Sequence, residues 1–272
     1  MTDASVFERY CSEIIEQNRL FRETLTAGRL DAQVPACPGW TLRDLAIHLG
    51  SDHLRAAQLV RTKADTFIRP DAVPGYGGPA ELAEATASDT YAELLGEWLS
   101  ACAQQVSDEL RLASEESPVW TLTGEDRAFF WARRRTLETL VHRADAAQAT
   151  GGKFEASPEL AADCMDEFLE LTSSGAALGW WPAMRTLAER DGDSLHLHAT
   201  DSSQSDAAEW LIRIGNEGFG WTRAHEKATA AARGPVADLL LVLTRRLSPA
   251  DERVEMLGDR ELLDFWLERV GF

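Results

Sequence analysis

Apolar residues recur every three or four positions through most of the first half of the chain, a spacing typical of amphipathic helices. This pattern predicts helices over residues 7–25, 94–110 and 126–150, and another that begins near Thr41. Thr41 and Asp44 have the spacing of a capping box, which supports that start. The segment RPDAVPGYGGPAE predicts an extended loop between the second and third helices. Four long helices with one extended connection favour a helical bundle.

The pattern changes beyond residue 190 to short alternating runs. SLHLHAT and EWLIRIG predict strands of an antiparallel sheet with one exposed face, and PVADLLLVLTRR and DRELLDFWLERV predict helices. In TGGKFEASPE, two glycines precede a Ser-Pro-Glu helix start, so a domain boundary is expected at residues 151–157. The predicted fold class is α+β, with a helical bundle over residues 1–152 and a smaller α+β domain over residues 157–272.

Composition excludes several classes of protein. With 272 residues, 44% hydrophobic residues and no low-complexity tract, the chain can fold around a core, which argues against disorder. The net charge of −18 would repel nucleic acid and anionic membrane surfaces. Without a long apolar run or a basic, apolar leader, a cytoplasmic location is expected. The cysteines form no CxxC pair and are expected to be reduced thiols: Cys11, Cys37, Cys102 and Cys164.

Two histidines and a glutamate lie at positions from which their side chains could bind one metal ion. Glu138 and His142 are four residues apart and so share one face of the fourth helix, although an exposed acid–imidazole pair has the same spacing. His48 would complete a three-ligand catalytic zinc site with an open position, or it is a core histidine bonded to backbone. His53 is rotated by roughly 140° from His48 and should point elsewhere.

Four segments of the chain carry a resemblance to a known family. VPACPGWTLRDLAIHLG, LETLVHRADAAQATG and GPVADLLLVLTRRLS, with the later LGDRELL, resemble the mycothiol-dependent maleylpyruvate isomerase family. The resemblance implies a DinB-like four-helix bundle that binds a divalent metal, followed by a domain similar to sterol carrier proteins. The family's metal ligands match His48, Glu138 and His142 in this chain.

Two acidic residues are candidates for orienting the histidine ligands. Asp44 precedes His48 by four residues, and Asp145 follows His142 by three, so each could bond the free ring nitrogen. Alternatively, Asp44 is only the acid of the capping box, and Asp145 is only a solvated acid on the helix surface.

Further residues are candidates for the substrate pocket. Arg134 and Arg135 lie within about 40° to 80° of the helix face shared by Glu138 and His142, so either could bind a substrate carboxylate. The alternative is that this run of arginines is solvated or pairs with neighbouring acids. Arg246 ends a helix, where cations are favoured, and is a weaker candidate that rests on the family's use of its second domain. Trp40 and Trp131 could form pocket walls, with core packing as the alternative.

Another pair of histidines lies in the second domain. His196 and His198 point to the same face of a predicted strand and could bind a metal together. Two exposed polar positions that alternate with leucines explain the pattern more simply.

These observations predict an enzyme that binds zinc or another divalent metal. By the resemblance, mycothiol is the thiol cosubstrate, and its thiolate would add to a small, anionic electrophile, for isomerisation or for S-transfer. No nucleic-acid or membrane partner is expected. The alternatives are a metal-hydroxide hydrolase that needs no thiol, and a non-catalytic module that binds a metal or small ligand.

Overall fold

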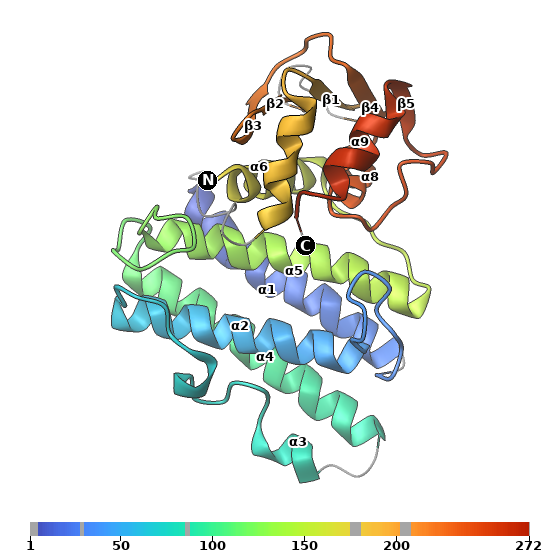
Figure 1. The fold of residues 1–272 in the computed structure, drawn as a ribbon. Helices are drawn as coiled ribbons and strands as arrows, with labels where there is room; N and C mark the ends of the chain where they lie inside the picture. Colours follow the sequence, from blue (N-terminus) through green and yellow to red (C-terminus); the bar gives the residue numbers. More distant parts are fainter. Residues whose placement is uncertain (1–4, 28–29, 85–87, 175–180, 202–207, 272) are drawn as a thin grey trace. The chain divides into compact units, whose positions relative to one another are not determined.

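The computed structural model describes residues 5–27, 30–84, 88–174, 181–201 and 208–271. The chain divides into two compact units, Met1–Phe154 and Glu155–Phe272 (Figure 1). The first unit is helical, and the second combines helices with a five-stranded sheet. The predicted α+β fold class is therefore confirmed.

Four long helices form the first unit. Helix α2 packs against α4 and α5, and α1 packs against α4 and α5 (Figure 1). Two short elements, η1 and α3, lie in the connection between α2 and α4. The bounds are α1 Val6–Ala27, α2 Leu42–Thr62, η1 Pro70–Ala72, α3 Ala80–Glu84, α4 Ser88–Ala113 and α5 Ala128–Thr150.

The start of α2 follows directly from local sequence. The side chain of Thr41 accepts a hydrogen bond from the backbone of Asp44, and the Asp44 carboxylate accepts one from the Thr41 backbone. This reciprocal capping box satisfies backbone donors that a helix start leaves unpaired. Gly39 precedes it with φ of +85°, a conformation that favours glycine in the Pro-Gly-Trp turn.

The predicted loop between α2 and α4 is present, but its apolar residues anchor it. Val73 is buried and packs with Leu54 of α2 and Cys102 of α4. The backbone N–H of Gly77 donates a hydrogen bond of 2.9 Å to Ser51 Oγ. The loop is therefore held along the bundle. The sequence pattern missed η1 and α3 because one to two helical turns are too short to show periodicity.

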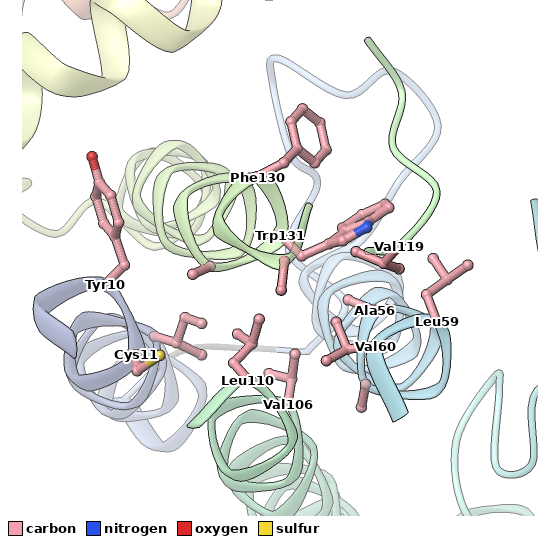
Figure 2. Close-up of a cluster of buried hydrophobic side chains, with 14 of the residues drawn as sticks. Tyr10, Cys11, Ala56, Leu59, Val60, Val106, Leu110, Val119, Phe130 and Trp131 are labelled. Carbon is pink, nitrogen blue, oxygen red and sulfur yellow. The ribbon is translucent and has the colours of Figure 1, made fainter. Parts of the chain in front are cut away.

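Apolar side chains from all four long helices meet in the core of the bundle. Figure 2 shows one cluster, to which α1 contributes Cys11, α2 Val60, α4 Leu110 and α5 Trp131. Trp131 is almost fully buried, and its indole Nε1 donates a hydrogen bond of 2.8 Å to the Trp120 carbonyl oxygen. The large indole of Trp131 fills the core, which agrees with the alternative of core packing, and its role as a pocket wall stays a prediction.

The second unit is built on a mixed sheet with strand order β3-β2-β1-β4-β5. Contacts of α8 with β1 and β4, of α6 with β3 and of α9 with β4 place these helices against the sheet. The bounds are α6 Pro158–Ser173, η2 Pro182–Arg190, β1 Ser194–Ala199, β2 Glu209–Gly215, β3 Gly218–Arg223, β4 Ala230–Gly234, α8 Val236–Leu243, β5 Glu255–Gly258 and α9 Arg260–Leu267.

The two predicted strands pair as expected, but the sheet as a whole is not antiparallel. Strands β1 and β2 are antiparallel neighbours, whereas β1 and β4 run parallel. The sequence pattern missed β3, β4 and β5. Strand β4 is AAARG, and β3 contains two glycines, residues with low strand propensity, so pairing with a neighbour determines their conformation.

In the described part of the chain, no helix has the length and apolar character needed to cross a membrane.

Limited proteolysis should separate the two units. Lys153 is exposed in an irregular segment between α5 and α6, so its backbone can enter a protease active site. We expect short trypsin digestion to cut after Lys153 and to leave two resistant fragments, identified by mass spectrometry. The Lys153→Gln variant should lose this cut. Early cleavage at the arginines inside α5, with Lys153 intact, would contradict this division.

Candidate metal centre

Two helices bring together the three side chains that are candidate metal ligands. Helix α2 contributes His48, and α5 contributes Glu138 and His142. His48 Nε2 lies 3.1 Å from Glu138 Oε1, and His142 Nε2 lies 3.9 Å from the same oxygen. The two imidazole rings are perpendicular, with centroids 5.2 Å apart. One carboxylate oxygen therefore faces both ring nitrogens that could ligate an ion.

The other oxygen of Glu138 faces two arginines. Arg135 Nη1 lies 2.7 Å from Glu138 Oε2, and Arg134 Nε donates to the same oxygen at 3.1 Å. Burial alone would raise the pKa of Glu138, but the charges of Arg135 and Arg134 and the hydrogen bond from His48 hold it well below its usual range. Glu138 is therefore ionised, the form that binds a cation.

Asp145 determines which nitrogen of His142 faces Glu138. His142 Nδ1 lies 2.8 Å from Asp145 Oδ2, and Asp145 is fully buried. An ionised Asp145 can only accept, which favours the His142 tautomer with the proton on Nδ1 and the lone pair on Nε2. Burial lowers the pKa of His142, which favours the neutral ring even though Asp145 opposes this effect.

This donor set fits a zinc-type ion. Two imidazole nitrogens and one carboxylate oxygen are common zinc ligands, and three protein ligands leave a position for a substrate or water. The donor atoms of His48, Glu138 and His142 lie within 4.8 Å of one another. Tetrahedral bonds of about 2.0–2.2 Å place ligand atoms about 3.4 Å apart, so small side-chain rotations would suffice.

Other candidates from the sequence lie in different surroundings. The Asp44 carboxylate accepts hydrogen bonds from Thr41 N at 2.8 Å and Thr41 Oγ1 at 2.6 Å, which matches its capping alternative. Trp40 contacts the His48 ring edge-on at a centroid distance of 5.1 Å, next to the donor atoms. Arg246 lies in the second unit, where its Nη1 donates to the Thr244 carbonyl oxygen.

The two arginine candidates differ in accessibility. Arg135 is 1% exposed, and its Nε donates to His53 Nδ1 at 3.3 Å, so it is enclosed by protein groups. The structure thus favours Arg135 as a positioning residue for Glu138 over the predicted contact with substrate. Arg134 keeps 12% of its side chain exposed, and its contact with substrate stays a prediction. His53 is fully buried against Arg135, which agrees with its exclusion from the metal ligands.

Sequence reasoning missed two groups at this centre. Asp52 Oδ2 lies 4.0 Å from His48 Nε2 and 3.7 Å from Arg135 Nη1. Its position four residues after His48 was an available signal, since such residues share a helix face. Cys37 Sγ lies 3.8 Å from Asp145 Oδ2, a proximity that no local spacing could indicate.

Two family models match the chain. The model described as Mycothiol maleylpyruvate isomerase N-terminal domain matches residues 11–147, and the model of the MDMPI C-terminal domain matches residues 159–265. The chain belongs to the mycothiol maleylpyruvate isomerase family. The candidate metal centre lies within the part that matches the family's N-terminal domain.

Solved structures support the same fold for this family member. The chain is similar to crystal structures of the mycothiol-dependent maleylpyruvate isomerase and of its histidine-to-alanine mutant. Identities are 15% and 14%, the TM-score is 0.56 for each, and 93% of both chains is covered in each comparison. At this identity the likeness shows the fold. No individually curated protein matches the chain significantly.

Replacing Glu138 should destabilise the chelator-treated protein in a pH-dependent way. Glu138→Gln removes the nearer carboxylate of the buried Arg135 and leaves only Asp52 at 3.7 Å, which should cost about 3 kcal/mol of unfolding free energy near neutral pH. Because the pKa of Glu138 in the folded state lies below 4.5, the wild-type advantage is full above that value. The stability difference between wild type and Glu138→Gln should disappear as the pH falls through the pKa of Glu138 in the folded state.

Urea unfolding at several pH values measures this difference. Glu97→Gln, at an exposed position of α4, is the matched control and should change stability by less than about 0.5 kcal/mol. A Glu138→Gln protein as stable as wild type near neutral pH would show that the carboxylate does not hold the arginines in place.

Proposed function

We propose that this chain is a metal-dependent enzyme that uses mycothiol to transform a small, anionic electrophile. The proposal rests on one observation above all: the donor atoms of His48 and His142 face a single oxygen of Glu138, while its other oxygen is held by arginines. Membership of the mycothiol maleylpyruvate isomerase family supports the choice of thiol.

His48, Glu138 and His142 would hold the ion, with zinc the best match to these donors. A divalent ion in this position lowers the pKa of a thiol that binds it and so provides a thiolate at neutral pH. Asp145 keeps the Nδ1 proton on His142 so that Nε2 remains available, and Arg135 fixes the orientation of the Glu138 carboxylate.

The charges around the centre favour anionic ligands. The centre contains three carboxyl groups, of Glu138, Asp52 and Asp145, and they are matched in number by the guanidinium groups of Arg55, Arg134 and Arg135. A divalent cation would therefore leave an excess of positive charge. A thiolate and a substrate carboxylate would balance that excess, with the partly exposed Arg134 as the candidate contact for the carboxylate.

In the proposed isomerisation, the thiolate sulfur adds to one carbon of an activated double bond. A carbon–sulfur bond forms, the double bond becomes single, and its electron pair moves onto the conjugated acceptor of the substrate. Rotation about the new single bond follows. The electron pair then returns to restore the double bond, and the thiolate leaves unchanged. If protonation traps the adduct before rotation and release, the same centre acts as an S-transferase.

Two alternatives remain distinct from this proposal. Bound water at the open position would give a metal hydroxide and a hydrolase that needs no thiol. A non-catalytic module would bind metal without turnover, although a purely structural zinc is usually closed by four protein ligands. The proposed location is the cytoplasm, which agrees with four free cysteines.

Asp145 and Asp44 should differ in their effect on metal affinity. Asp145→Asn removes the carboxylate that orients His142, so zinc affinity at this centre should fall about 10–100-fold. Asp44→Asn is the matched control and should leave the affinity unchanged, because that carboxylate bonds Thr41. Competition with a chromophoric chelator measures both. Equal losses in the two variants would contradict the assigned role of Asp145.

Cobalt substitution tests the thiol directly. With cobalt in place of zinc, adding mycothiol or a cysteinyl-thiol analogue should produce a thiolate-to-cobalt charge-transfer band. The band should appear near neutral pH, below the free-thiol pKa of about 8.5, because the ion stabilises the thiolate. His142→Ala should abolish it. An unchanged spectrum at saturating thiol, with thiol-free hydrolysis of an ester or amide, would replace this proposal with the hydrolase.

A further inference from the structure

A second group of histidines converges in the sheet of the C-terminal unit. The chain contains 6 histidines, and His196, His198 and His225 are those of this unit. His196 and His198 lie on one face of β1, and Glu209 of β2 is the direct cross-strand partner of His198. His225 follows the end of β3, the next strand of the sheet.

All three imidazoles contact the carboxylate of Glu209. His196 Nε2 lies 2.8 Å from Oε2, and His225 Nδ1 lies 2.5 Å from the same oxygen. His198 Nδ1 lies 2.9 Å from Oε1. The three rings have pairwise centroid distances of 5.4–6.0 Å. One donor atom from each of the four residues lies within 4.8 Å of all the others.

The surroundings favour a built site over a chance surface cluster. His196 and Glu209 are only 7% and 5% exposed, which corrects the simpler interpretation for His196, whereas the His198 side chain keeps 29% exposure. Burial alone would raise the pKa of Glu209, but hydrogen bonds with His225 and His196 and the charge of His198 lower it. Glu209 is therefore a carboxylate at neutral pH, ready to ligate a cation.

We propose that His196, His198, Glu209 and His225 form a second metal site, separate from the centre in the helical bundle, that binds zinc. Three imidazole nitrogens and one carboxylate oxygen match the ligands of tetrahedral zinc, whose donor atoms lie about 3.4 Å apart. The ring nitrogens that would bind zinc are those that now face the carboxylate: His196 Nε2, His198 Nδ1 and His225 Nδ1.

The number of protein ligands indicates the role of this second ion. Four ligands close a tetrahedral zinc, as in structural sites, whereas the bundle centre offers three and leaves a position open. The ion would tie β1 to β2 and fix the segment after β3 through His225. The His225 side chain is 72% exposed, which gives the ion a path from solvent.

Zinc stoichiometry in the full-length chain tests this proposal. Equilibrium dialysis with metal analysis should find about two zinc ions per wild-type chain. His142→Ala, which disables the bundle centre, should retain the ion in the C-terminal unit. His225→Ala should lose that ion or bind it at least 10-fold more weakly. Since the His225 side chain is exposed, this variant should fold, as circular dichroism would check.

Glu209→Gln provides a second variant for the same site. It keeps the shape of the side chain and removes the charge, so it should weaken zinc binding in the His142→Ala background. Zinc should also raise the melting temperature of His142→Ala, but not that of the double variant His142→Ala and His225→Ala. If His142→Ala binds no zinc, or if His225→Ala and Glu209→Gln bind as wild type does, the second site does not exist. The thiol experiment on the bundle centre is independent of that result.

Discussion

The ionised carboxylate of Glu138 lies between two histidines on one side and two arginines on the other, with 12% of its side chain exposed to water. Isolated in such a place, a carboxylate would be neutralised by protonation. The arginines oppose this, and Arg135 in turn is buried with Glu138 as its nearer compensating carboxylate and Asp52 as the second. Each group therefore depends on the other, and the negative oxygen that faces His48 and His142 is a consequence of that pair.

The packing of the bundle helices places these charged side chains next to one another. Glu138 and His142 share a face of α5 through their spacing, but His48 reaches them only because α2 packs against the same helix. The capping box at Thr41 fixes where α2 begins, and the apolar clusters hold the helices together around the charged groups. Packing of the apolar core thus determines the positions of the polar side chains at the centre.

The two histidine clusters use the same ligand types in different ways. In the bundle, the Glu138 carboxylate is shared between two imidazoles and two guanidinium groups, so three candidate ligands converge and a bound ion would keep a position for an exchangeable ligand. In the C-terminal unit, three imidazoles surround Glu209 and complete a set of four. The first arrangement suits chemistry on a bound thiol, and the second suits a fixed ion that ties strands together.

Much of this protein followed from sequence because its signals are local. The four long helices, the capping box at Thr41, strands β1 and β2, and the proximity of Glu138 and His142 all depend on residues a few positions apart. His48 lies far from them in the chain; its place on another bundle helix made it a candidate, and the resemblance to a family supported that choice. Tertiary structure alone decided the parallel pairing of β1 with β4, the burial of Arg135 and Trp131, and the meeting of His225 with Glu209. These features depend on which surfaces pack together, and pairing between distant segments leaves no periodic trace in the amino-acid sequence.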